Sequence, residues 1–318
     1  MIETRFTDLV GLGAPIQLAG MPGVCTVELA AAVSRAGALG MISATHLTPE
    51  FLSQQLDRLR SLTDGAFGVN FLMPFLDLDC VRVAASKSRV VEFFYDAPDP
   101  SLVTIAHSEG ALVSWQVGSR EEAVHAARAG CNFIVAQGAE AGGHVRGDIR
   151  LNELLPDVLR TVDIPVIVAG GVATGKDLAD AINTGADGAR IGTRFAASKE
   201  SGAHPGYIED ILNAGPGSTV LTETFSGGWP HAHHRVLKSC VEEVNKFDGE
   251  TVGERKLGEE TTPIPKYSIA LPTKDTTGHI EAMALYAGEC VGEIKSVLSA
   301  EEIVKEITNE AESLISPG

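Results

Sequence analysis

Residues 119–144 read SREEAVHAARAGCNFIVAQGAEAGGH and contain one helix, one strand and the loop that follows it. Ser119 is suited to cap a helix over Arg120–Ala129, with Glu122 completing a capping box and a glycine ending the helix. The apolar run Phe133–Gln137 then predicts a buried strand. This succession of helix, strand and glycine-rich loop is the repeating unit of a parallel α/β protein.

The same unit recurs on both sides of this stretch, at intervals of roughly 20–30 residues. Helical patterns occupy 27–35, 49–62 and 101–108, and a segment rich in small residues lies at 81–86. The predicted strands are Pro15–Gly20, Leu39–Ala44, Phe67–Met73, Val90–Tyr95, Ala111–Val117, Phe133–Gln137, Pro165–Ala169 and Gly188–Phe195. Eight strands with helices between them predict a (β/α)8 TIM barrel, whose active site lies at the carboxyl ends of the strands.

More chain follows the eighth strand than one closing helix requires, so we expect three parts. Residues 1–214 form the barrel. Residues 215–276 are rich in Gly, Pro, Thr and charge, which predicts an irregular C-terminal extension that caps the substrate side of the barrel mouth. Residues 277–318 contain helical patterns at Ile280–Leu298 and Glu301–Leu314, which we expect to pack back on the barrel.

The charge balance narrows the range of partners. The chain has 25 Lys and Arg residues against 42 Asp and Glu residues, a formal net charge of −17. This field repels nucleic acid and anionic membrane surfaces. No apolar run approaches the ~20 residues of a spanning helix, and the first residues lack a signal-peptide pattern. We expect a cytoplasmic protein that binds a small molecule, not nucleic acid or membrane.

The cysteines agree with this expectation. Five cysteines are widely spaced and none forms a CxxC pair. Such usage is typical of reduced thiols in a reducing compartment.

Two glycine-rich segments one βα unit apart carry the strongest chemical signal. They are VIVAGGVATG at 166–175 and GARIGTRFAAS at 188–198. Main-chain N–H groups of glycines after a strand can approach a phosphate, and a following helix N-terminus adds a partial positive charge. We predict that Gly170, Gly171, Gly192 and Thr193 bind a phosphate group. Turns that only close the βα loops are the alternative.

Three other segments could surround a flat ring system. Gly20, Met21 and Pro22 end the first strand in a bend that could form a wall against a ring, although a plain turn is also open. Asn70 and Gln137 are amides at the ends of apolar strands and must find hydrogen bonds if they are buried. Either a cofactor with N–H and C=O edges or neighbouring main chain would satisfy them.

His144 lies at the tip of the glycine-rich loop after the sixth predicted strand. Gly142 and Gly143 give this loop conformational freedom, and we count both among the residues near the cofactor. An imidazole ordinarily titrates near neutrality, as a proton-transfer group should. We predict that His144 is catalytic, with a structural histidine as the alternative.

These motifs together resemble a known family. The segments AGMPGV, FGVN, QGAEAGGH, AGGVATG, IGTRF and ALYAGECVG are similar to those of the FMN-dependent nitronate monooxygenases, formerly called 2-nitropropane dioxygenases. FMN-dependent enoyl-acyl-carrier-protein reductases share nearly all of them. The resemblance runs from about residue 8 to residue 295 in the same order.

The resemblance implies a cofactor, a catalytic residue and two reactions. FMN would bind with its phosphate at Gly171, Gly192 and Thr193 and its ring against Gly20–Pro22, Asn70 and Gln137. His144 would remove the α proton of a small nitroalkane, the flavin would oxidise the resulting nitronate, and O2 would reoxidise the flavin. The alternative is reduction of an enoyl thioester with NADH or NADPH. A flavin-binding barrel without turnover is a third hypothesis.

One loop departs from the family pattern. FSGGWPHAHHRVLKS at 225–239 stands where the family commonly has a short Arg-containing stretch. We expect no metal here because no nearby acid or thiol completes the histidine cluster. Substrate contacts are predicted for Trp229, His231 and His233 in this loop and for Tyr286 in ALYAGECVG. The sequence leaves the oligomeric state open, with a homodimer as one candidate.

Overall fold

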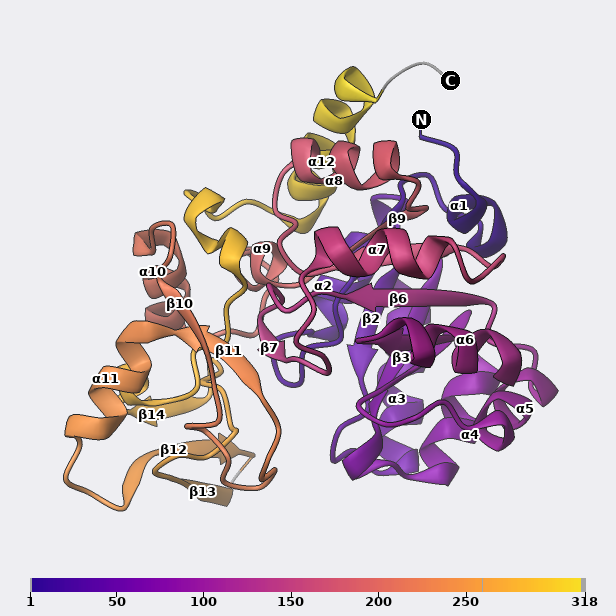
Figure 1. Ribbon diagram of the computed structural model, residues 1–318. Helices are drawn as coiled ribbons and strands as arrows, with labels where there is room; N and C mark the ends of the chain where they lie inside the picture. Colours follow the sequence, from indigo (N-terminus) through magenta and orange to yellow (C-terminus); the bar gives the residue numbers. More distant parts are fainter. Residues whose placement is uncertain (1, 259, 316–318) are drawn as a thin grey trace.

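The computed structural model describes residues 2–258 and 260–315 and confirms the predicted TIM barrel. Eight parallel strands lie in the order β1-β9-β8-β6-β5-β4-β3-β2, and helices surround them (Figure 1). The two ends of this sheet meet because Leu39, which immediately precedes β2, exchanges main-chain hydrogen bonds with Ile16 and Leu18 of β1. The loops after the strands therefore gather at one end of a closed barrel.

Each predicted strand is present, with shorter bounds in most cases. The strands are β1 (Ile16–Leu18), β2 (Gly40–Ser43), β3 (Phe67–Leu72), β4 (Val90–Phe94), β5 (Leu112–Val117), β6 (Phe133–Gln137), β8 (Val166–Ala169) and β9 (Gly188–Ile191). The predicted extension of the eighth strand to Phe195 is wrong. The chain turns at Gly192 into the short helix α9 (Thr193–Ala196), which lies over the end of the strand.

Helices connect the strands as the alternating pattern predicts. They are α2 (Val27–Arg35), α3 (Pro49–Leu62), α4 (Leu78–Lys87), α5 (Pro100–Ser108), α6 (Arg120–Ala129), α7 (Leu151–Leu159) and α8 (Gly175–Thr184). Ser119 caps α6 through the Glu122 N–H, and Gly130 ends the helix with φ +96°. The predicted capping box is incomplete, because the Glu122 carboxylate accepts from the Gly118 N–H and pairs with Arg146 instead.

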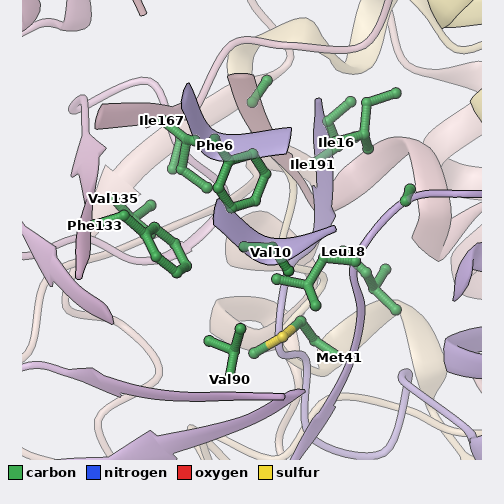
Figure 2. Close-up of a cluster of buried hydrophobic side chains, with 14 of the residues drawn as sticks. Phe6, Val10, Ile16, Leu18, Met41, Val90, Phe133, Val135, Ile167 and Ile191 are labelled. Atoms are coloured by element: carbon green, nitrogen blue, oxygen red, sulfur yellow. The ribbon is translucent and has the colours of Figure 1, made fainter. Parts of the chain in front are cut away.

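The amino-terminal helix α1 (Arg5–Val10) closes the end of the barrel opposite the loops. Figure 2 shows Phe6 among side chains of several strands, and its ring lies 5.0 Å from that of Phe133. Arg5 pairs with Asp187, which immediately precedes β9. Helix α1 therefore covers the amino-terminal end of the barrel, opposite the strand-end loops.

Helix α12 (Ala300–Leu314) completes the barrel after a long excursion of the chain. It packs against α8 and α2, in the place of an eighth barrel helix (Figure 1). The residues between α9 and α12 form a second group of elements with its own hydrophobic core. These elements are α10 (Pro205–Asn213), β10 (Thr219–Thr222), β11 (His234–Leu237), α11 (Lys238–Lys246), β12 (Thr251–Leu257), β13 (Glu260–Pro265), β14 (Thr276–Gly278), η2 (Ile280–Ala282) and η3 (Glu289–Glu293).

Two expectations for this second group are wrong. Residues 215–276 are not irregular, since they contain β10 to β13, α11 and the first residue of β14. Ile280–Leu298 does not form an α-helix. Its main chain is held by other segments instead, as the Leu237 N–H donates to Leu285 and the Gly288 N–H donates to the Thr193 hydroxyl. No helix in the described residues is long and apolar enough to cross a membrane.

Candidate active site

A cavity of about 510 Å³ lies where the carboxyl ends of the strands meet the second group of elements. Barrel loops and residues from the second group both line it. Most of the residues predicted for the site line this cavity: Gly20, Met21, Pro22, Asn70, Gln137, Gly142, Gly143, His144, Gly170, Gly171, Gly192, Thr193, Trp229 and Tyr286. The fold therefore brings segments from residue 20 to residue 286 into one place.

The predicted phosphate loops have the backbone that such a role requires. Gly170 and Gly171 have φ of +100° and +76°, a region that favours glycine. A Cβ on Gly170 would lie 2.8 Å from the Ala141 main-chain nitrogen, so no side chain fits there. In the part of the chain that the structure describes, the N–H groups of Gly171 and Val172 have no hydrogen-bond partner. These donors are free to bind an anion.

The start of the helix that follows this loop is already occupied by acidic side chains. The Asp177 carboxylate accepts from the Ala173 and Thr174 N–H groups, and Glu310 accepts from the Gly175 N–H. The expected contribution of a free helix N-terminus at α8 is therefore wrong, because these carboxylates neutralise it. The loop glycines and Thr193 remain as anion donors.

Asn70 has one amide atom bonded and one free. Its Nδ2 donates to the Glu92 carboxylate at 3.0 Å. An ionised carboxylate can only accept hydrogen bonds, so the Asn70 atom bonded to Glu92 must be the amide nitrogen. The amide atom without a partner is therefore the oxygen. That oxygen is buried, has no partner among the described residues, and belongs to a residue that lines the cavity. A ligand with an N–H edge would satisfy it.

Gln137 uses its amide differently. Its Nε2 donates to the His144 carbonyl at 2.9 Å, and its Oε1 accepts from the Arg146 N–H at 3.0 Å. The neighbouring main chain therefore satisfies this amide, which was the alternative to a cofactor contact. Gln137 fixes the loop that carries His144.

The His144 loop is also held by the second group of elements. Gly143 and His144 form the short strand β7, which pairs with Arg235 and His234 of β11. A Cβ on Gly142 would lie 2.5 Å from the Gly288 nitrogen. Glycine is thus required at 142 for close approach of two segments, and the loop has a fixed place.

The environment of His144 corrects the expectation that it titrates near neutrality. Burial lowers the pKa of His144 to about 3, and the neighbouring His234 contributes in the same direction. Its Nε2 atom is buried and has no hydrogen-bond partner among the described residues. His144 is therefore a neutral imidazole at physiological pH, with a buried ring nitrogen to which no group of the described residues is bonded.

Aromatic side chains surround this imidazole. Trp229 stacks on it with ring centroids 4.0 Å apart, and the Tyr286 ring lies at 5.7 Å. Trp229 also contacts Tyr95 and Phe75 edge to face. These rings exclude water from one side of His144, which explains the direction of its pKa shift.

The other two histidines of the loop lie elsewhere. His231 and His233 are exposed and face Glu223, with His233 Nε2 at 3.1 Å from its carboxylate. Neither lines the cavity, so the structure does not bring these two predicted residues together with the others. The chain turns at Pro230 and His231, so that Trp229 lies inward while the two histidines lie on the outer side of the loop.

Two arginines that the sequence did not single out also line the cavity. Arg190 comes from β9, within the glycine-rich segment 188–198, and Arg255 comes from β12. No acidic residue of the described chain lines the cavity. Arg190 could have been noticed as a charge inside an apolar strand, whereas nothing local marks Arg255 among the charged residues around it.

Taken together, the lining fits FMN. The free N–H groups of the loop at 170–172 suit a phosphate, and the free Asn70 oxygen suits the N–H edge of a flavin ring. Small residues at Gly20 and Ala19 leave room on one wall. A Cβ on Gly20 would lie 2.4 Å from the Asn70 Cβ, so only glycine fits beside this amide.

Comparisons with known proteins agree with this geometry. The family model described as nitronate monooxygenase matches residues 3–79 and 77–310. A dehydrogenase of a hydroxy-methyl-oxo-octahydroindene carboxyl-CoA from Rhodococcus jostii is 33% identical, over 78% of this chain and 68% of the relative.

Two solved structures cover nearly the whole chain. FabK from Thermotoga maritima has a TM-score of 0.82 and 30% identity, over 98% of this chain and 97% of that chain. Nitroalkane oxidase from Streptomyces ansochromogenes has a TM-score of 0.80 and 28% identity, over 98% and 99%. Because the family model spans almost the entire sequence, this chain belongs to the nitronate monooxygenase family and is a flavin-dependent oxidoreductase.

Proposed function

We propose that this enzyme uses FMN to oxidise a small alkyl nitronate with O2. The observation that carries the proposal is the charge of the cavity lining. In a chain of net charge −17, the charged side chains that line the cavity are Arg190 and Arg255, and the described residues supply no carboxylate there. Arg190 is paired with the buried Glu92, so Arg255 is the lining cation that has no ion-pair partner among the described residues, and it favours an anionic substrate such as a nitronate.

FMN is the flavin that we assign. One pair of phosphate loops serves one phosphate group, and the chain has no further glycine-rich βαβ fingerprint for a second nucleotide half. Gly170, Gly171, Gly192 and Thr193 would hold the phosphate, and Asn70 would accept from the ring. When bound, the flavin would accept electrons from the substrate and pass them to O2.

The low pKa of His144 separates nitronates from neutral nitroalkanes. A general base works best when its pKa lies near the operating pH. Because burial lowers the pKa of His144 to about 3, it is a weak base for removing the α proton of a nitroalkane. A nitronate has already lost that proton. We therefore place the preformed nitronate ahead of the neutral nitroalkane as the substrate.

His144 still has a role with a nitronate. Its free Nε2 atom would hydrogen-bond and orient the substrate, while Trp229 and Tyr286 exclude water around it. Gln137 holds the carbonyl of the same residue and so fixes where the ring lies.

Arg255 would supply the attraction for the anion. Its guanidinium donates to the Leu271 carbonyl, and its Nε atom is buried without a partner. No carboxylate of residues 2–258 and 260–315 pairs with it. A half-buried guanidinium without an ion-pair partner suits a ligand of opposite charge. Because Arg255 comes from the segment after the barrel, we propose that residues 215–276 form a cap over the substrate side of the barrel, which comprises residues 1–214. Residues 277–318 return the chain to the barrel.

A thioester oxidoreductase is the second candidate. The relative from Rhodococcus jostii is named for a carboxyl-CoA substrate, and the unpaired Arg255 would also suit the diphosphate of CoA or of NADH or NADPH. A flavin-binding barrel without turnover is set aside, because the family to which the chain belongs is one of oxidoreductases.

Anaerobic mixing of the FMN-loaded enzyme tests the proposal. We expect an alkyl nitronate to bleach the flavin absorbance within the turnover time, and air to restore it with consumption of O2. Three results together would establish the second candidate instead: NADH or NADPH bleaches the flavin rapidly, an enoyl thioester reoxidises it, and a nitronate is not turned over. A homodimer in solution is a separate expectation that the elution volume of the native enzyme would check.

A further inference from the structure

A buried carboxylate lies beneath the floor of the cavity. Glu92 of β4 is fully buried and accepts hydrogen bonds from Gln17 Nε2 at 2.8 Å, Asn70 Nδ2 at 3.0 Å and Ser114 Oγ at 3.4 Å. One guanidinium nitrogen of Arg190 lies 2.6 Å from its Oε1 atom. These side chains come from β1, β3, β4, β5 and β9, so the network crosses the interior of the barrel.

The ion pair has a direction. Arg190 lines the cavity and also donates to Gln116, which lines it too. Glu92, Gln17 and Ser114 do not line the cavity. The positive end of the pair therefore faces the ligand, and the negative end is held below it by three neutral donors.

A buried ion pair is in general weak evidence for a contribution to stability. Asn70, Glu92 and Ser114 stand level with one another on β3, β4 and β5 and point to the same face of the sheet, whereas the fully buried Val69, Val91 and Val113 point to the opposite face. Replacing a buried ion pair with apolar side chains of similar volume is often neutral or stabilising. The orientation of the pair, with its positive end toward the cavity, is thus better explained by what it does to a bound ligand.

We propose that the Glu92–Arg190 pair raises the reduction potential of the bound flavin. Reduction of FMN by two electrons and one proton adds a negative charge to the ring, and preorganised positive charge nearby stabilises it. This proposal rests on one part of the proposed function, the binding of FMN in this cavity. Glu92 has a second task, because its bond to Asn70 Nδ2 turns the amide oxygen toward the ligand.

Two single substitutions should shift the potential in opposite directions. Arg190→Met removes the positive end and should lower the midpoint potential of bound FMN. Glu92→Gln removes the balancing negative charge and should raise it. Each shift should be at least about tenfold in the equilibrium between reduced and oxidised FMN, which is about 30 mV for a two-electron couple. Dye-equilibration titration of the anaerobic holoenzymes measures both, and the double variant should lie between them.

A matched control lies at the other end of the same strand. Asp187 immediately precedes β9, is also buried and pairs with Arg5 beneath the barrel. Asp187→Asn should reduce stability without changing the flavin potential. If Arg190→Met and Glu92→Gln shift the potential in the same direction, or no more than Asp187→Asn does, the pair is structural and the proposal is overturned.

Wild-type protein supplies a second measurement in case a variant does not fold. Sulfite binding to a flavin also adds negative charge to the ring, so FMN in this protein should bind sulfite much more tightly than free FMN does. Sulfite affinity no greater than that of free FMN would overturn the proposal, and so would failure of the chain to take up FMN. If the two variants shift the flavin potential in opposite directions but the enzyme oxidises no nitronate, the proposed substrate is refuted and the role of the ion pair stands.

Discussion

The indole ring of Trp229 and the imidazole of His144 stack with centroids 4.0 Å apart and an interplanar angle of 20°. Trp229 is itself nearly buried, between Phe75 and Tyr95. A loop of the second group of elements thus covers a residue on a barrel loop. This contact links the position of the second group of elements to the protonation of His144.

Removing the indole should raise the pKa of His144. In Trp229→Ala, water reaches the imidazole and the desolvation that lowers its pKa is reduced. We expect the pKa to move from about 3 toward the ordinary value of 6.5. NMR titration of the imidazole protons measures the shift. Trp229→Phe keeps a ring over His144 and should retain most of the depression, whereas equal pKa values in all three proteins would show that Trp229 does not control it.

The same depressed pKa predicts acid sensitivity of the fold. The unfolded chain binds a proton at His144 with a pKa near 6.5, and the folded chain does so only near 3. The unfolded state therefore binds more protons between these values, so the free energy of unfolding falls as the pH drops below about 6.5 and continues to fall toward about 3.

His144→Asn should remove part of this dependence, at about 1.4 kcal/mol per pKa unit at most. Urea unfolding at neutral pH and near pH 5 measures it. His234 has a lowered pKa for the same reason, burial, so some acid sensitivity should remain in the variant. An unchanged slope of stability against pH in His144→Asn would show that His144 is not desolvated as described.

The barrel could be predicted from sequence because its strands are buried on both faces. Runs such as Phe133–Gln137 and Val166–Ala169 are continuous and apolar, and glycines or N-caps mark the ends of the helices. The hairpin of β12 and β13 could not be found this way. Its side chains at 260–263 are exposed, so the strand carries no alternation of apolar and polar residues.

The candidate site likewise contains some residues that local sequence pattern predicts and others that it does not. Gly170 and Gly171 could be predicted from local pattern, because glycine is required by their own backbone conformation. The pKa of His144 and the position of the Arg255 guanidinium depend on residues distant in sequence, Trp229 and Leu271 among them. The helix predicted at Ile280–Leu298 does not form for a related reason. Tertiary hydrogen bonds at Leu285 and Gly288 outweigh its helical pattern.

Gly192→Asp should weaken FMN binding far more than it weakens the fold. Gly192 has φ −114°, which other residues adopt, and a Cβ there would lie no closer than 3.3 Å to Ala19. A carboxylate at this position would face the phosphate, and we expect the Kd for FMN to rise at least ~100-fold. Fluorescence titration with FMN measures it. Gly192→Asn has the same shape without the charge and should bind FMN much better; equal losses in both would place the phosphate elsewhere.

His144→Ala should lower nitronate oxidation by the value of one hydrogen bond to a charged ligand. Such a bond is worth ~1.5–3 kcal/mol, which is roughly a 10- to 100-fold loss in kcat/KM. The loss of a general base would be larger, ~10²–10⁴-fold, and would appear only with the neutral nitroalkane. Oxygen consumption with a matched nitroalkane and nitronate measures both, with bound FMN checked in each protein. If neither rate falls, His144 is structural.

Arg255→Met should weaken binding of an anionic substrate without affecting the cofactor. The guanidinium has one hydrogen-bond partner among the described residues, the Leu271 carbonyl, and its Nε is free to meet a ligand. The methionine retains much of the apolar stem but removes the charge. We expect KM for the nitronate to rise ~10- to 100-fold, the usual value of a charge-assisted hydrogen bond, with the Kd for FMN unchanged.

Arg255→Lys retains the charge without the planar fork and should recover part of the loss. The neighbouring Lys256→Met changes the same net charge at an exposed position on the same strand, so it controls for the long-range field. If Lys256→Met raises KM as much as Arg255→Met does, the substrate is attracted by the overall field of the cap and not by a contact. A loss confined to Arg255→Met would assign the guanidinium to the substrate itself, because long-range attraction depends on net charge whereas a buried contact depends on one side chain.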